Sequence, residues 1–464
     1  MPVPMSSGVY YVFVAAVFFL YWAVAGSRHA RLAVVLFANY LFAARYGLFY
    51  VVLLPLCSSI DFLVGLGLMR FRAQALRRAL VGVSLALNLG LLVGSRHVGW
   101  MLGRAGGSAA HWDWVFPLGL SFYAFQALTY SIDLYRRDAD GTHSLLEYLA
   151  SVSFFPTLLA GPITRVADLV SQFAKRPMLN GNEGGRAFFL IGLGLAKKTF
   201  LANFLAENLV NRVFDTPTLY SGAETLIAVY AYSLQLYFDF SGYTDIARGV
   251  GMLLGIRLPI NFDRPYTAAN LTDFWRRWHL SFSNWLRDYL YFSLPGGRTK
   301  PMPYLNLVIT MVLGGLWHGI TGPFFAWGLL HGTGLAATRF WMAKRGRKRK
   351  AANVWMKGAA IFGTYQFVCL TWIFFRASSL ENAFAILGRI GSLSVGFENI
   401  SATLLAALGI GAATFAIRKQ WYAWAEDRFV RSPFWVHAAA MLGLILAIRL
   451  LGGRGNVPFV YSRF

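Results

Sequence analysis

A succession of long apolar runs is the feature that most constrains how this chain can fold. Many of the runs approach the roughly 20 apolar residues that a helix needs to cross the hydrocarbon core of a bilayer. They predict an all-α polytopic integral membrane protein, with a less regular region between the fifth run and about residue 270. The expected spans lie near residues 8–26, 31–46, 48–69, 79–95, 114–134, 304–320, 323–342, 355–376, 402–417 and 434–452.

The composition supports this class of protein. Of the 464 residues, 57% are hydrophobic and only 14% are charged, and the mean hydropathy is +0.50. Such values are too apolar for a soluble enzyme. No long polar segment separates the runs, so residues 1–464 are expected to form a single integral membrane domain. Val9–Ala25 ends in Ala-Val-Ala, as signal peptides do, but no basic residue precedes it. It is expected to remain as the first transmembrane helix.

The basic residues form short clusters between the apolar runs. Lysine and arginine number 43 against 20 acidic residues, a formal net charge of +23. This distribution is the positive-inside pattern of membrane proteins, and it argues against a nucleic-acid partner. By alternation, the clusters at 28–31, 70–78 and 136–137 share one side, which we take as cytoplasmic, so the N-terminus is expected outside. The cluster at 344–350 marks another cytoplasmic loop, and the side of the C-terminus stays open.

The stretch from Asn270 to Leu294 places a histidine among aromatic residues. Asn270 is a plausible helix N-cap with Asp273 at the third helical position, and Pro295 ends the pattern. On a continuous helix, His279 lies on the aromatic face rather than the charged face. Two interpretations stay open, a packing histidine in an interfacial helix and a chemical role. The aromatic face would consist of Trp275, Trp278, His279, Phe282, Leu286 and Tyr289.

A second histidine closes the next apolar run. The run ends in Gly-Gly-Leu-Trp-His-Gly, which contains His318, and Gly322-Pro323 interrupts the helix before a segment that carries His331. Glycines leave room beside the histidine for another backbone or for a substrate. A broken helix at membrane depth is tolerated where its backbone is buried or lines a cavity. The alternative is that His318 binds a neighbouring carbonyl and fixes helix packing.

Polar residues also lie inside apolar surroundings in the middle of the chain. Asp239 and Asp245 are either structural carboxylates at a helix break or partners that orient a catalytic histidine. The basic residues of this region either attract the phosphates of a coenzyme or carrier, or extend to the cytoplasmic rim. They are Lys197, Lys198, Arg257 and Arg264. Cys57 and Cys369 both lie in apolar runs, so neither a disulfide framework nor a metal site is indicated.

Several motifs of the chain resemble one known family. WRRWHLSFSNWLRDYLY and GGLWHG are similar to motifs of the membrane-bound O-acyltransferase family, closest to its bacterial alginate and peptidoglycan O-acetyltransferases and the teichoic acid D-alanyl transfer protein. The resemblance covers most of residues 117–331. It also includes PLGLSFYAFQALTYSIDLYRR (117–137), FFPTLLAGPITR (154–165), GLAKK (194–198) and LQLYFDFSGYTDIARGVGMLLGIRLPINFDRPY (234–266). The terminal residues 459–464 depart from this branch by a Ser-Arg pair, which leaves a terminal contact in doubt.

The resemblance implies a multi-helix bundle with a buried tunnel and no bound metal or cofactor. It makes His318 the essential catalytic residue and His279 a second functional histidine. It further implies an acyl thioester, either acetyl-coenzyme A or an acyl carrier, that arrives from the cytoplasm. The acceptor, an extracytoplasmic polysaccharide or a partner acetyltransferase protein, approaches from the other face of a bacterial inner membrane, with lipid around the bundle.

The chemistry fits these residues. Moving an acyl group from a thioester to a hydroxyl requires a base, and a neutral buried imidazole can serve. No G-x-S-x-G elbow and no H-E-x-x-H metal motif is present, so direct transfer is the simplest scheme. His318 would be the base, and His279 would polarise the thioester carbonyl or hold the acceptor. Candidate tunnel-lining residues are Trp278, Ser283, Asn284 and Trp317.

Two rival functions stay open. One is D-alanyl transfer from a carrier protein, although residues 5–61 look more like the alginate acetylation branch. The other is a transporter or channel that relays protons through histidine and aspartate. Internal repeats with paired broken helices would favour the transporter, and the sequence shows no convincing repeat.

Overall fold

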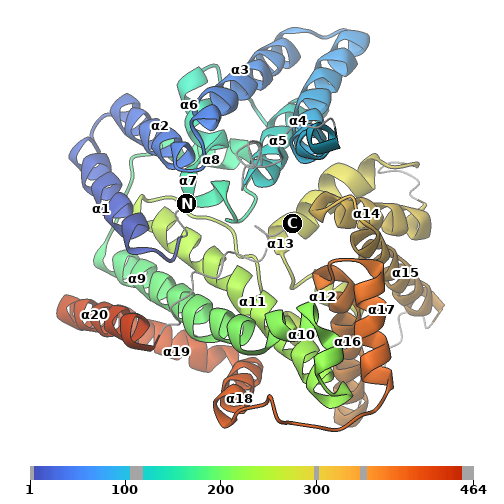
Figure 1. The fold of residues 1–464 in the computed structure, drawn as a ribbon. Helices are drawn as coiled ribbons and strands as arrows, with labels where there is room; N and C mark the ends of the chain where they lie inside the picture. Colours follow the sequence, from blue (N-terminus) through green and yellow to red (C-terminus); the bar gives the residue numbers. More distant parts are fainter. Residues whose placement is uncertain (1–4, 105–118, 297–301, 345–352, 452–464) are drawn as a thin grey trace. The chain divides into compact units, whose positions relative to one another are not determined.

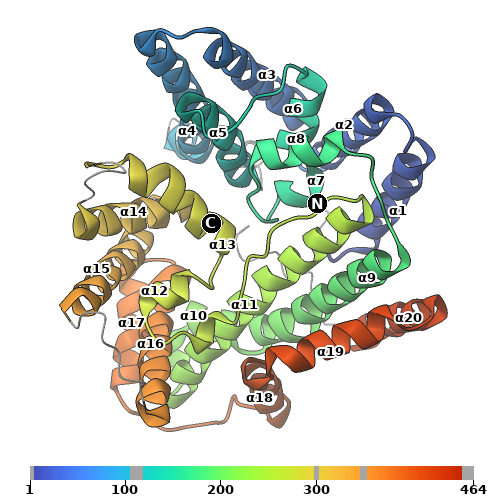
Figure 2. The same cartoon turned by 180° about the vertical axis from the view of Figure 1, so that it is seen from behind.

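The computed structural model describes residues 5–104, 119–296, 302–344 and 353–451 (Figures 1 and 2). Every described element is a helix, and these residues contain no strand, which confirms the all-α prediction. Three sequence-based expectations fall outside the described residues. They are the basic cluster beyond Lys344, the terminal residues 459–464 and the first part of the expected span 114–134.

The chain divides into two compact units. One comprises Met1–Ile191 and Tyr243–Pro259, and the other comprises Gly192–Gly242 and Ile260–Phe464. Two helices, α9 (Gly181–Ala196) and α11 (Gly222–Leu253), contribute residues to both units.

The first unit is built around α5 (Leu120–Arg136). Almost all of its residues from Phe122 to Leu134 are buried. Its polar groups form hydrogen bonds within the unit, and the Gln126 side chain donates to the Ser151 carbonyl at 2.9 Å. A helix that is buried all round belongs to the interior of a bundle. Its neighbours are α3 (Leu48–Arg70), α4 (Gln74–Arg104), α6 (Leu145–Val152), α7 (Phe155–Leu158) and α8 (Val166–Ala174). Outside them, α2 (Arg28–Ala44) packs on α3 and α6, and α1 (Gly8–Ala23) packs on α2.

The second unit holds both motif segments singled out above. Its core is an aromatic cluster that includes Trp278, Trp327 and Trp372. The helices that lie wholly in this unit are α10 (Asn211–Asp215), α12 (Leu271–Trp275), α13 (Leu280–Trp285), α14 (Pro303–His318), α15 (Gly322–Lys344), α16 (Val354–Arg376), α17 (Leu380–Gly391), α18 (Ala402–Ala416), α19 (Lys419–Val430) and α20 (Phe434–Leu451). Short π and 3-10 segments are η3 (Lys197–Asn203), η4 (Ala206–Val210), η5 (Pro217–Leu219), η6 (Pro265–Thr267), η7 (Leu286–Leu290) and η8 (Tyr291–Ser293).

Among the described residues, five helices are long and apolar enough to cross a membrane, and α18 with α19 forms a further pair bent by 97°. The chain is therefore a polytopic membrane protein. Four of the five agree with predicted spans, and the other predicted spans are helices that are shorter or less apolar. The five are Phe49–Arg70, Gln74–Gly94, Gly181–Asp215, Val354–Arg376 and Phe434–Leu451.

The prediction of a less regular region before residue 270 is confirmed for the short helices α6 to α8, but two long helices follow them. Gly181–Asp215 is a candidate span of 35 residues, and α11 is a helix of 32 residues. Charged residues such as Lys198 and Asp239 interrupt the apolar pattern, so neither helix could be predicted from apolar periodicity. Lys198 Nζ lies 2.6 Å from Asp239 Oδ1, and both side chains are 1% exposed. The ion pair allows two charges to stay buried, Lys198 in the π-helical segment after α9 and Asp239 in α11.

Candidate active site

The predicted continuous helix from Asn270 to Leu294 is wrong, because the chain breaks at His279. The N-cap is confirmed, since Asn270 Oδ1 accepts the Asp273 backbone N–H at 2.9 Å. However, α12 ends at Trp275, and α13 begins at Leu280. The backbone of His279 is left-handed, with φ +43°. A non-glycine residue in this region costs roughly 1–2 kcal/mol, so surrounding contacts must hold it.

Asn261 supplies those contacts. Its side-chain Oδ1 accepts the Ser281 backbone N–H at 3.0 Å, and its carbonyl accepts the Leu280 N–H at 2.9 Å. The same Oδ1 lies 3.4 Å from His279 Nδ1, at the long end of hydrogen-bond range. Because a backbone N–H can only donate, the oxygen of the amide must face this turn. His279 Nδ1–H then donates to it, which leaves Nε2 as the acceptor nitrogen of a neutral ring.

The His279 side chain is almost fully buried, with 1% of its surface exposed. It lies between two short helices, outside the candidate spans. Burial lowers the pKa of its imidazole well below the ordinary value. The ring therefore stays neutral around physiological pH, because the charged form would lose its hydration.

His318 is the last residue of α14 and is 4% exposed. Aromatic rings surround its imidazole, with centroid distances of 4.5 Å to Trp317, 4.8 Å to Phe375, 5.6 Å to Trp327 and 5.8 Å to Phe324. The imidazole therefore lies in an enclosure of aromatic rings at the end of the helix.

Phe282 connects the two predicted catalytic histidines. Its ring stacks on His279 at 5.0 Å and on Trp317 at 4.7 Å. It also meets the His318 ring edge-to-face, at 6.1 Å. The break at His279 therefore brings α13 against the end of α14, and three predicted site residues gather around one phenyl ring.

The other predicted site residues occupy different positions. Trp278 is buried and packs on Phe274 and Trp372, with ring centroids 5.6 and 5.1 Å away. The Ser283 hydroxyl donates to the Trp278 carbonyl at 3.0 Å and so supports the turn. Asn284 is exposed. All three residues belong to the segment that carries His279.

Helices α14 and α15 lie side by side and antiparallel (Figure 1). Glycines allow their backbones to come close together. A Cβ atom on Gly315 would lie 2.4 Å from the Phe324 carbonyl oxygen, and one on Gly328 would lie 2.5 Å from the Met311 oxygen. Only glycine permits these backbones to approach so closely. The expectation that glycines make room for a neighbouring backbone is therefore confirmed, and the close packing positions His318.

His331 lies in α15 with both ring nitrogens engaged. Trp275 Nε1–H donates to Nδ1 at 3.3 Å, and Nε2 lies 2.9 Å from Thr371 Oγ1. The Thr371 hydroxyl donates its proton to the Val368 carbonyl, so His331 Nε2–H must be the donor to Thr371. This network fixes a neutral tautomer in the helix core.

The charged residues of the middle region have partners of their own. Besides the Lys198–Asp239 pair, Arg248 lies 3.7 Å from Asp245, and Arg257 lies 2.9 Å from Glu183. Arg264 donates to the Phe415 carbonyl. These contacts favour the structural interpretation of both aspartates. Within the described residues, no group of three or more His, Cys, Asp or Glu side chains could hold a metal ion.

Sequence reasoning missed Asn261 and Phe375. Neither residue stands at a helical spacing from the histidine that it contacts, so no local pattern could have indicated them. Phe282 was placed on the aromatic face, but its position between two histidines depends on the break at His279.

Comparison with known proteins shows the family to which the chain belongs. The model of the MBOAT, membrane-bound O-acyltransferase family, matches residues 120–375. A probable alginate O-acetylase of Azotobacter vinelandii is 42% identical over 60% of this chain and 54% of its own length. One from Pseudomonas fluorescens is 34% identical over 99% of both chains. A teichoic acid D-alanyltransferase of Streptococcus thermophilus is 32% identical over 56% of this chain and 68% of its own. Since the family match spans more than half of the sequence, the chain belongs to the membrane-bound O-acyltransferase family.

Proposed function

We propose that this O-acyltransferase moves an acetyl group from a cytoplasmic thioester to a hydroxyl of an extracytoplasmic polysaccharide, or to a partner protein that serves it. The observation that carries the proposal is the meeting of His279, His318 and Trp317 around Phe282. The O-acetylases among the relatives are more similar to this chain than the D-alanyltransferase is, which favours acetyl over D-alanyl. We place the enzyme in the bacterial inner membrane and treat it as one domain, because α9 and α11 run unbroken through the boundary between the units.

In the proposed reaction, His318 accepts the proton of the acceptor hydroxyl as its oxygen attacks the thioester carbonyl. A carbon–oxygen bond forms, the carbon–sulfur bond breaks, and the imidazolium returns the proton to the departing thiolate. General-base assistance of this kind is worth about 10²–10⁴-fold. The aromatic rings that surround His318 exclude water that would hydrolyse the thioester.

His279 is proposed to hold the acceptor. Its Nδ1–H faces Asn261, so Nε2 is the nitrogen that can accept a hydrogen bond. A neutral ring in this tautomer suits a hydroxyl donor better than a carbonyl oxygen, which would need a donor. This tautomer therefore supports the acceptor-holding role of His279 over polarisation of the thioester carbonyl.

Trp317 and Asn284 are proposed to contact substrate in a tunnel that leads to His318. Trp317 is half-buried and stacks on Phe282, whereas Asn284 is exposed on α13. Trp278 and Ser283 would act through the turn that they support. No resident cofactor is required, because the thioester is consumed as a substrate.

Acyl-group transfer in membranes tests the proposal. Vesicles carrying the protein would receive radiolabelled acetyl-coenzyme A, an acetylated carrier or a D-alanylated carrier, and thiol release would be followed with label in the acceptor fraction. Vesicles without the protein and vesicles with His318→Ala are the matched controls. Thiol release that depends on the protein and on an acetyl thioester is expected. Activity with the D-alanylated carrier alone would replace acetyl by D-alanyl, and absence of any thioester consumption would favour the transporter.

A further inference from the structure

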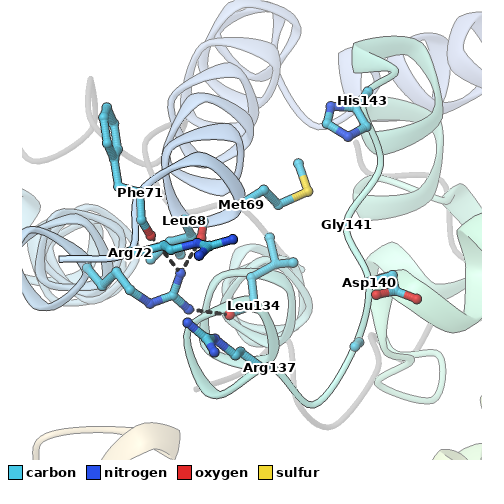
Figure 3. A pocket seen from close by; sticks show the side chains of 11 residues that line it. Leu68, Met69, Phe71, Arg72, Leu134, Arg137, Asp140, Gly141 and His143 are labelled. Atoms are coloured by element: carbon cyan, nitrogen blue, oxygen red, sulfur yellow. Dashed lines mark hydrogen bonds between the residues drawn. The ribbon is translucent and has the colours of Figure 1, made fainter. Parts of the chain in front are cut away.

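We propose that the first unit carries a binding pocket for a phosphate-bearing anion, supplied by a lipid headgroup. The pocket has a volume of about 770 Å³ and lies between the end of α3 and the segment that follows α5 (Figure 3). Arg72, Arg77, Arg137 and His143 line it, together with one carboxylate, Asp140. The function proposed above does not use this site.

Arg77 builds the floor of the pocket. Its buried guanidinium donates to the Leu68 and Phe71 carbonyls at the end of α3. It also donates to the Leu134 and Tyr135 carbonyls, both at 2.9 Å, at the end of α5. An arginine suits these positions because the last carbonyls of a helix lack partners and carry negative partial charge. The two helix ends are therefore tied together, and the pocket is formed before any ligand arrives.

Two further arginines supply the charge for a ligand. Arg72 and Arg137 have neither a hydrogen bond nor an ion pair from their guanidinium groups to any residue that the structure describes. Figure 3 shows Arg72 and Arg137 close to Leu134, with Asp140 and His143 on the chain segment opposite. Because three arginines outweigh one carboxylate, an anion is the complementary ligand. Planar guanidinium groups bind phosphate oxygens in pairs, so a phosphate suits these two arginines.

The neighbouring surface points to lipid as the source of the phosphate. Apolar side chains of α3 and α4 face outward, including Val52 and Val83, which are 65% and 50% exposed, and these helices are candidate spans. Phe71, which lines the pocket, is 42% exposed. The pocket therefore opens at the end of lipid-facing helices, at headgroup level. The positive-inside pattern assigns this end to the cytoplasmic leaflet, which carries anionic lipids.

The test compares a pocket variant with a charge-matched control. The Arg72→Gln/Arg137→Gln variant removes the two arginines, and Arg70→Gln/Arg78→Gln removes two exposed arginines that do not line the pocket. The purified full chain would be titrated with phosphatidylglycerol or phosphatidylcholine, and bound lipid counted by native mass spectrometry. Wild type and control should prefer phosphatidylglycerol. The pocket variant should bind it about 30-fold more weakly, since each arginine near an anionic headgroup contributes about a factor of five.

Further measurements identify the source of the phosphate and control for misfolding of the variant. Asp140→Asn should fold normally and bind phosphatidylglycerol more tightly than wild type, because it removes the one negative charge. Inorganic phosphate and coenzyme A are added as competitors. Displacement of the lipid by either compound at low concentration would overturn the lipid assignment in favour of a soluble phosphate. If the pocket variant and the control lost affinity for phosphatidylglycerol equally, the binding pocket itself would be overturned.

The leaflet assignment can be checked separately. Cys57 and Cys369 are buried, so an introduced cysteine would dominate labelling. An impermeant maleimide added outside intact cells should label Ser7→Cys and spare Asp140→Cys. Labelling of Asp140→Cys from outside would place the pocket in the outer leaflet and overturn the proposal as stated.

Discussion

His318 and His331 lie on two packed helices and are almost equally buried, yet their surroundings differ in kind. His331 is in the middle of α15, where an indole N–H and a threonine hydroxyl engage its two nitrogens. His318 ends α14, where aromatic rings surround it and the chain turns at Gly319. A buried titratable ring is therefore not in itself a sign of chemistry. What separates the two is that His318 stands at a helix end among aromatic rings, whereas both ring nitrogens of His331 are hydrogen-bonded in the middle of a helix.

The largest expected effect tests this contrast at His318. Replacing it with alanine or glutamine should lower acyl transfer by at least about 10²-fold, because neither side chain offers a basic nitrogen. Expression should stay near normal, since the helix keeps its own backbone bonds. The measurement is acetyl transfer in membranes that carry equal amounts of each protein. Activity within a few-fold of wild type in either variant would remove His318 as the base and move that role to His279.

An intermediate effect is expected at His279, where substitutions can distinguish the loss of the imidazole ring from strain in the left-handed backbone. His279→Asn keeps a residue that tolerates the left-handed backbone and should lower activity about 10-fold, near the value of one lost hydrogen bond. The loss should show as a higher KM for the acceptor. The His279→Gly protein should be well folded, and its activity should be at least as low as that of His279→Asn. The His279→Ala protein should show the same loss of activity and, in addition, a lower yield. If the folded His279→Asn protein had a normal KM for the acceptor, the proposal that His279 holds the acceptor would be wrong.

The pH profile offers a related check. Because burial holds the pKa of His279 well below its ordinary value, its protonation cannot cause a loss of activity near neutral pH. Any acid limb in that range should therefore persist in His279→Asn. If the limb disappeared in this variant, the neutral state assigned to the ring would be wrong.

The smallest effect is expected at His331. Glutamine can accept from Trp275 and donate to Thr371, so His331→Gln should retain activity within a few-fold of wild type. His331→Leu is the matched comparison. It leaves the Trp275 N–H and the Thr371 oxygen without their partner, at about 1–3 kcal/mol for each buried group, so its melting temperature should fall. A well-folded His331→Gln protein as inactive as the His318 variants would erase the distinction between the two histidines.

The sequence predicted those parts of the site that depend on local pattern. The Asn270 cap, the end of α14 before Gly322-Pro323 and the close glycine packing all follow from residues near one another in the chain. The break at His279 could not be predicted, because it depends on Asn261, which binds the turn from 18 residues away. The helix through Lys198 was hidden for a similar reason, since the partner that neutralises its charge is on α11.

The left-handed backbone at His279 has a consequence for how this lineage can change. Few residues other than glycine and asparagine occupy such a conformation without strain, and histidine reaches asparagine by a single base substitution. A gene copy released from selection would then lose the ring while the fold survives. Among descendants of such duplications, asparagine or glycine at this position with an intact Asn261 should mark proteins that have kept the architecture while their binding of the acceptor has weakened. Surveying genomes for that pair would separate weakened copies from fully active ones before any assay.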